Sequence, residues 1–121
     1  MGNFLILTGD AGVNEIPIGG IVEITSPNYP SNYPNNAYEE WELVAPSGFV
    51  VRLNFTDFYT ESCCDQLTIN DGLTSTRLSG SSLPNDYFSR GTYLELVFSS
   101  DYSVTYSGFR LEATAFNTSS K

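Results

Sequence analysis

Apolar and polar residues alternate along almost every apolar segment of this 121-residue chain, and no segment repeats with a helical period. In residues 92–98, for example, Leu94, Leu96 and Phe98 occupy every second position. A period of two places successive side chains on opposite faces of a β-strand. Clusters of Pro, Gly, Asn and Ser separate these segments, as is typical of turns between short strands. The sequence therefore predicts an all-β chain with almost no helix.

The spacing of the segments indicates how the strands are arranged. About eight to ten short strands separated by turns are typical of a β-sandwich made of antiparallel sheets. Residues 4–8 are expected to form an edge strand, followed by a turn over residues 9–12. Residues 41–45 and 49–57 are expected to form a hairpin around a tight turn at residues 46–48.

The predicted core consists of the apolar residues that face one way in these strands. Trp41 has two interpretations: a lone Trp in a strand either packs in the core, which the general burial of large aromatic residues favours, or lies exposed as a binding platform. Tyr29 and Tyr33 are expected to be packing anchors in the turn-rich segment 26–36. The residues expected to supply the core are Leu43, Val51, Leu53, Phe55, Leu67, Ile69, Leu94, Leu96, Phe98, Phe109 and Leu111.

The chain is strongly acidic, with 14 acidic residues, five basic residues and a net charge of −9. This charge disfavours nucleic acid and anionic membrane surfaces as partners, and it favours a cation or a basic protein. The longest apolar run near the start, residues 4–7, is too short for a membrane span or a signal-peptide core. We expect one domain over residues 1–121 without membrane insertion, with any secretion signal or neighbouring domain outside this sequence.

The only two cysteines, Cys63 and Cys64, are adjacent in the sequence. They cannot link distant strands, and their spacing does not fit a zinc or thioredoxin-type motif with two intervening residues. The chain also lacks histidine, which excludes most zinc sites and Ser-His or Cys-His triads. In an oxidising compartment we favour a vicinal disulfide over two free thiols or an intermolecular link.

Two N-glycosylation acceptor sequences begin at Asn54 and at Asn117. Such triplets also arise by chance, but they fit an extracellular protein. The expected strand over residues 49–57 places Asn54 on its outer face, where a glycan is accommodated.

Three acidic residues occupy strand ends. Glu61 and Asp65 lie in a short loop between apolar strands, and Asp101 ends the segment Phe98-Ser-Ser-Asp101. Three carboxylates that meet at one edge of a sheet would bind a hard cation such as Ca²⁺. The alternative is that each acid caps a turn or faces solvent.

Several motifs occur in order and at suitable spacing along the chain. They are Ser26-Pro-Asn-Tyr-Pro, Tyr33-Pro-Asn-Asn, Trp41, Pro46-Ser-Gly48, Asp65-Gln-Leu-Thr-Ile-Asn-Asp-Gly72 and Phe98-Ser-Ser-Asp101 through Gly108-Phe109. Together they resemble a CUB domain over about residues 19–116, with residues 117–121 as a tail. The resemblance implies an extracellular jelly-roll β-sandwich of the kind found in complement and tolloid-type proteases, endocytic receptors and spermadhesins.

The resemblance extends to the calcium-binding members of this family. It implies that Glu61, Asp65 and Asp101 bind Ca²⁺ together with the backbone carbonyl of Ser103, and that Tyr33 braces the glutamate. Calcium takes about six to eight oxygen ligands, and water completes an open coordination shell.

Two departures from the family pattern concern this site. Both usual family disulfides are missing, because Glu39 and Ser79 stand where cysteines are expected. The loop over residues 61–65 is also shorter than the common pattern, which leaves open whether Glu61 still reaches the ion.

The sequence thus predicts an extracellular, Ca²⁺-dependent protein-recognition module that binds exposed Lys or Arg side chains of a partner. Tyr59 and Tyr102 flank the acidic residues and are candidate partner contacts. The alternatives are a Ca²⁺-independent glycan-binding module and a targeting domain of a larger secreted enzyme. Catalysis by the chain itself is not expected, although Glu61 and Asp65 superficially resemble a glycosidase pair.

Overall fold

The structure is a computed structural model that describes residues 4–7 and 12–118. These residues form ten strands and no helix, which confirms the all-β prediction. The strands are β1 (Phe4–Leu7), β2 (Val13–Glu15), β3 (Ile21–Thr25), β4 (Tyr38–Val44), β5 (Phe49–Tyr59), β6 (Gln66–Asn70), β7 (Ser75–Leu78), β8 (Tyr87–Phe88), β9 (Tyr93–Ser99) and β10 (Gly108–Asn117).

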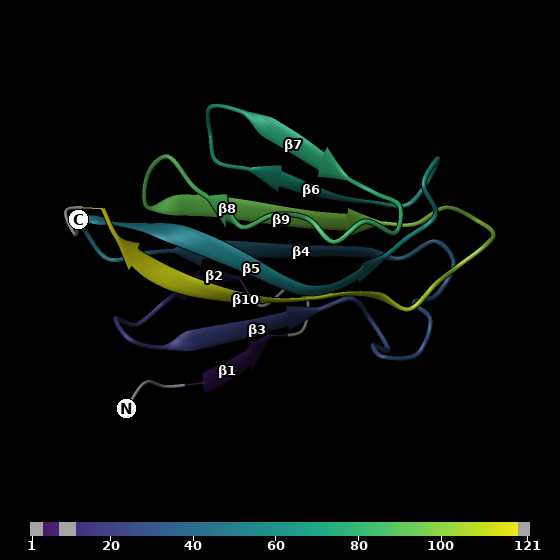
Figure 1. Ribbon diagram of the computed structural model, residues 1–121, viewed down its shortest axis with the longest axis horizontal. Helices are drawn as coiled ribbons and strands as arrows, with labels where there is room; N and C mark the ends of the chain where they lie inside the picture. The colour runs from purple at the N-terminus through teal and green to yellow at the C-terminus, as the bar shows by residue number, and fades with distance from the viewer. Residues whose placement is uncertain (1–3, 8–11, 119–121) are drawn as a thin grey trace.

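The strands form two five-stranded sheets that pack into a β-sandwich, as predicted (Figure 1). One sheet has the order β1-β3-β10-β5-β8, and the other has the order β2-β4-β9-β6-β7. Neighbouring strands are antiparallel except at one edge of each sheet, where β1 pairs with β3 and β2 pairs with β4 in parallel. The first part of the chain therefore contributes one parallel edge strand to each sheet.

The hairpin predicted for residues 41–45 and 49–57 is wrong. β4 pairs with β9 in one sheet, whereas β5 lies between β10 and β8 in the other. The predicted turn does form, because the amide of Phe49 donates to the carbonyl oxygen of Pro46 over 3.0 Å. The turn connects the two sheets instead of two paired strands. Both strands bury one face, and that local pattern is the same in either arrangement.

Two short strands were not predicted, and one expected element lies partly outside the described residues. β2 and β8 have three and two residues, so they are too short to produce an alternating pattern. The expected edge strand at residues 4–8 corresponds to β1. Residue 8 of that strand and residues 9–11 of the expected turn lie outside the described residues.

The core fills the space between the sheets, and every predicted core residue is buried. Trp41 is 1% exposed and packs edge-on against Phe109, so its core interpretation is correct. Tyr33 is equally buried and packs against Phe98, whereas Tyr29 is half-buried.

Candidate metal centre

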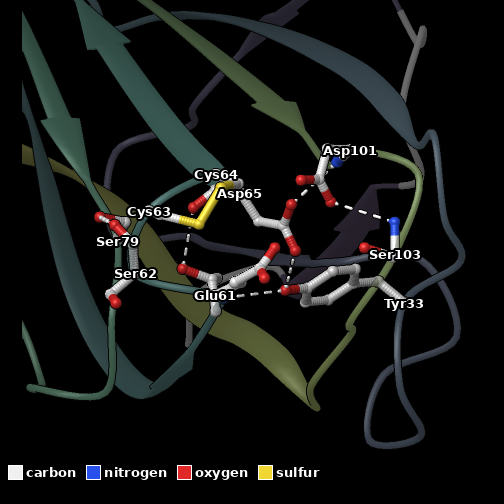
Figure 2. Close-up of a disulfide and its surroundings, with 10 residues drawn as sticks. Tyr33, Glu61, Ser62, Cys63, Cys64, Asp65, Ser79, Asp101 and Ser103 are labelled. Atoms are coloured by element: carbon white, nitrogen blue, oxygen red, sulfur yellow. Dashed lines mark hydrogen bonds between the residues drawn. A yellow bond between two sulfur atoms is a disulfide. The ribbon is translucent and has the colours of Figure 1, made fainter.

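The three acidic residues singled out in the sequence meet at one end of the sandwich. Glu61 and Asp65 lie in the loop between β5 and β6, and Asp101 follows β9. One carboxylate oxygen from each of the three lies within 4.8 Å of those of the other two (Figure 2). The shortened loop therefore keeps Glu61 beside the other two acids.

Asp65 is the most firmly held of the three acids. Its side chain is fully buried, and its two carboxylate oxygens accept hydrogen bonds from the Tyr33 hydroxyl (2.6 Å) and the Asp101 amide (2.8 Å). The hydroxyl of Thr60 donates to the Asp65 carbonyl oxygen over 3.0 Å and fixes the backbone. These contacts orient the carboxylate without neutralising its charge.

Glu61 has an unsatisfied polar atom. Its Oε1 atom is buried and has no hydrogen-bond partner. Burial raises the pKa of this carboxyl above its ordinary value, and the charges of Asp101 and Asp65 raise it further. Within residues 12–118 none of the ion pairs formed by arginine involves Glu61, Asp65 or Asp101. The three acids thus lack a protein cation in the part of the chain that is described.

Tyr33 connects Asp65 to the loop backbone. Its hydroxyl donates to Asp65 and accepts a hydrogen bond from the Glu61 amide over 3.2 Å. Burial and the hydrogen bond to Asp65 raise the pKa of the Tyr33 phenol well above its usual range, so the hydroxyl keeps its proton. Tyr33 therefore braces Glu61 through its amide.

Ser103 lies beside the acids, as Figure 2 shows. Its amide donates to the Oδ1 atom of Asp101 over 3.2 Å. The role of its carbonyl oxygen as an ion ligand stays a prediction. Val104, the next residue, has a φ of 64°, which is uncommon for a β-branched side chain.

The acidic loop is constrained by a disulfide within it and by a hydrogen bond from a neighbouring segment. Cys63 and Cys64 are joined by a disulfide, with their Cα atoms 3.7 Å apart. The hydroxyl of Ser79, at a position where the family usually has a cysteine, donates to the carbonyl oxygen of Ser62 over 3.0 Å. This hydrogen bond links the acidic loop to the segment after β7.

The predicted partner contacts are both exposed, and each lies within two residues of one of the acids in the sequence. Tyr59 is 46% exposed and Tyr102 is 78% exposed. The Tyr59 ring stacks on Tyr106, with ring centroids 4.3 Å apart. Both exposed tyrosines directly adjoin the loops that carry the acids.

The two glycosylation candidates lie away from this cluster. Asn54 is on the outer face of β5, as expected, and its side chain donates to Asp86 over 2.8 Å. Asn117 is exposed at the end of β10. Attachment of glycans at Asn54 and Asn117 stays a prediction.

The sequence analysis missed Thr60 as a supporting residue, and it did not predict the packing role of Gly108. Thr60 is buried, and its side chain also accepts a hydrogen bond from the Gly80 amide (3.0 Å), so it joins the acidic loop to the segment after β7. Gly108 is buried beside Ser26 and Tyr33. A strand-end Thr directly before an acidic loop is a weak signal, and the motif that contains Gly108 does not reveal which residues approach it in space.

The donor set fits a hard cation. It consists of carboxylate oxygens, one of which is buried without a partner, and no nitrogen ligand is involved. Calcium prefers oxygen ligands of this kind and tolerates irregular geometry. The residues that would hold it are Glu61, Asp65 and Asp101.

Comparison with known proteins identifies the family. The sequence profile described as "CUB domain" matches residues 19–112. This chain belongs to the CUB domain family. Cubilin from the dog is 34% identical to it over 114 residues, covering 86% of this chain and 3% of cubilin. This chain therefore spans only a small part of the length of the cubilin that it matches.

Two solved structures support the same assignment. The extracellular region of zebrafish Gpr126/Adgrg6 is 25% identical, has a TM-score of 0.77, and is matched over 97% of this chain and 15% of that one. The second CUB domain of MASP-1, solved bound to Ca²⁺, is 25% identical with a TM-score of 0.74, over 94% and 98% of the two chains. The calcium-bound relative matches this CUB domain almost from end to end.

The family and its relatives establish the general class of this protein. CUB domains are non-catalytic modules that mediate protein–protein interactions in extracellular proteins, and this CUB domain is of that extracellular class. Among residues 4–7 and 12–118 there is no helix with the length and apolar character needed to span a membrane.

Proposed function

We propose that this CUB domain is a Ca²⁺-dependent recognition module that binds a Lys or Arg side chain of a protein partner. The observation that carries the proposal is the meeting of three carboxylates, from Glu61, Asp65 and Asp101, within 4.8 Å of one another. Bound Ca²⁺ supplies the positive charge that stabilises such an arrangement. The calcium-bound MASP-1 domain supports the choice of ion.

Each acid has a distinct role in the proposed site. Asp65 is fixed by Tyr33 and by the Asp101 amide, so it provides a preorganised ligand. Glu61 contributes the buried oxygen that has no other partner, and Ser103 is proposed to add a carbonyl oxygen. Carboxylate oxygens that are not directed at the ion accept charge-assisted hydrogen bonds from a partner ammonium or guanidinium group.

The surrounding tyrosines provide the contact area that one charged contact lacks. A hydrogen bond to a charged group contributes about 1.5–3 kcal/mol, which alone gives weak binding. Tyr59 and Tyr102 are exposed beside the acids and offer flat aromatic surfaces to the partner. Tight binding therefore needs these contacts or several domains acting together.

The calcium site is tested by calorimetric titration of the protein with Ca²⁺. Replacing one of three charged ligands is expected to weaken binding, so Asp101→Asn should lower Ca²⁺ affinity at least about tenfold, which corresponds to about 1.4 kcal/mol. Glu15→Gln is the matched control, because Glu15 is exposed and pairs with Val44, at the end of β4 that is farther from Asp101. Equal melting temperatures in Ca²⁺ and in chelator would rule out the site.

Recognition of basic side chains is tested with a single-lysine peptide and the same peptide acetylated at that lysine. Ca²⁺ makes the protein less negative, so a nonspecific charge attraction weakens when the ion is added. The proposed recognition instead strengthens in Ca²⁺, and it is lost on acetylation. Binding that persists in chelator contradicts the proposed mechanism.

Glycan binding is the second candidate function, and the stacked pair of Tyr59 and Tyr106 favours it. An exposed aromatic face suits the apolar face of a sugar ring. A glycan array probed in chelator separates the two functions, because hits retained without Ca²⁺ support the glycan-binding alternative.

A further inference from the structure

A disulfide lies inside the proposed calcium-binding loop. Cys63 and Cys64 are both exposed, and they are bonded to each other between Glu61 and Asp65 (Figure 2). No other disulfide occurs in the described part of the chain. A bond between adjacent residues cannot stabilise the sandwich as a whole. It constrains only the turn that carries two of the three acids.

The sulfur atoms are close to the acid cluster. One carboxylate oxygen of Glu61 and the Sγ atoms of Cys63 and Cys64 all lie within 4.8 Å of one another. The amides of Cys64 and Asp65 both donate to the Glu61 carbonyl oxygen over 3.1 Å. A change in the backbone at the two cysteines is thereby transmitted to both acidic residues within a single turn.

The rest of the loop is held by neighbouring segments. The Thr60 amide donates to the Gly80 carbonyl oxygen over 2.8 Å, and Ser79 donates to the carbonyl oxygen of Ser62. These hydrogen bonds fix the beginning of the loop, and Asp65 is fixed by its own buried contacts. The exposed pair Cys63 and Cys64 is the part whose conformation the disulfide restricts.

We propose that the Cys63–Cys64 disulfide is a redox control on the calcium site, an inference that rests on the proposed function. The oxidised ring limits the backbone freedom of the two residues and keeps Glu61 beside Asp65 and Asp101. A dithiol reductant opens the ring by thiol–disulfide exchange. Its two thiols become a disulfide, while the two cysteine sulfurs each gain one electron and one proton. The opened loop loses conformational freedom when it binds Ca²⁺, so affinity falls.

Thermodynamic linkage adds a second consequence. If reduction lowers Ca²⁺ affinity by a given factor, Ca²⁺ shifts the reduction equilibrium of the disulfide by the same factor. We expect this factor to be on the order of tenfold, within the usual range of coupling between two sites. Calcium-bound protein is therefore more resistant to reduction than ion-free protein.

The test compares Ca²⁺ titrations of the oxidised protein, of the protein reduced by a dithiol under anaerobic conditions, and of the double variant C63S/C64S. Mass spectrometry of the protein verifies the redox state. The reciprocal shift of the disulfide reduction equilibrium is measured in dithiol redox buffers that contain Ca²⁺ or Mg²⁺. We expect the oxidised protein to bind Ca²⁺ about tenfold more tightly than both other forms. The affinity of C63S/C64S should not respond to reductant.

The outcomes separate this inference from the proposed function. Weaker binding in the reduced protein, together with a matching Ca²⁺-dependent shift of the redox equilibrium, supports the redox control. Equal affinity of the oxidised and reduced wild-type protein overturns it and leaves the calcium site intact, whether or not the double variant folds. Absence of Ca²⁺ binding in every form overturns the proposed function and the redox control with it.

Discussion

Glu61 lies where its own charge is unfavourable in the ion-free protein. Its Oε1 atom is buried without a hydrogen-bond partner, and Asp65 and Asp101 bring two further negative charges close. A carboxyl group whose pKa is raised by folding destabilises the folded state at pH values above its unfolded pKa. The charge of Glu61 therefore destabilises the ion-free protein, whereas the same charge favours the proposed binding of Ca²⁺.

The substitution Glu61→Gln tests both effects of the charge, because it removes the charge and keeps the shape of the side chain. In chelator at pH 7 the variant should melt at a higher temperature than the wild-type protein, since one of three neighbouring charges is gone. In Ca²⁺ it should gain little further stability, whereas the wild-type protein should gain much more. Calorimetric melting in both buffers gives the comparison. A variant that melts below the wild-type protein in chelator contradicts this account of Glu61.

β10 begins beside the site at a residue that must be glycine. Gly108 has a φ of 85°, and a Cβ atom there would lie 1.8 Å from the Ser26 hydroxyl oxygen and 3.2 Å from the Tyr33 ring. The Ser26 hydroxyl accepts a hydrogen bond from the Phe109 amide over 3.0 Å, so it cannot move freely. This contact connects the start of β10 to the tyrosine that holds Asp65.

The substitution Gly108→Ala is expected to be among the most destabilising changes in this region. Gly48→Ala is the matched control, because Gly48 has a φ of 87° with open space around it. That control carries only the left-handed backbone cost, about 1–2 kcal/mol, and Gly108→Ala adds the steric clash to it. Urea unfolding of both variants measures the difference. Equal losses of stability in both variants contradict a steric role for Gly108.

Pairing between elements decides where the acids lie. Gln66 pairs with Ser99, so the residues just before β6 lie beside the residues just after β9. Asp65 and Asp101 occupy these two positions and meet for that reason. A slip of one residue in this register moves every side chain of the strand to the opposite face. The site therefore depends on the register between β6 and β9.

The whole molecule is acidic, and none of its four described arginines forms an ion pair with an acid of the calcium cluster. Three of them form ion pairs with Asp86, Asp71 or Glu23, away from the calcium cluster. Asp71 also accepts hydrogen bonds from the amides of Leu73 and Thr74. These hydrogen bonds hold the pKa of the Asp71 carboxyl below its usual value, and Arg90 adds to the effect.

The depressed pKa of Asp71 predicts a contribution to acid stability. A carboxyl group with a lowered pKa in the folded state stabilises the protein above its unfolded pKa, and this stability is lost as pH falls through the folded pKa. In chelator, Asp71→Asn should lower the free energy of unfolding at pH 7 and reduce the difference between pH 7 and pH 3. Urea unfolding at the two pH values measures this, with Glu15→Gln as control. An unchanged pH dependence contradicts the role of Asp71.

The local pattern of the sequence predicted much of this fold. Alternation with a period of two correctly indicated the buried faces of β5, β6 and β9, because successive side chains of a strand point to opposite faces of the sheet. The Pro and Gly residues at positions 46–48 correctly predicted the turn between β4 and β5. The family motifs pointed to Glu61, Asp65 and Asp101 before any contact between them was known.

Only the tertiary structure decided which strands are partners and how the acids meet. β4 and β5 are adjacent in the chain but lie in different sheets, and no local pattern distinguishes pairing within a sheet from packing across the sandwich. The meeting of Glu61 with Asp101 depends on long-range register, and the contact between Gly108 and Ser26 depends on close approach in space. Burial is determined by local alternation, whereas these contacts form between residues far apart in the sequence.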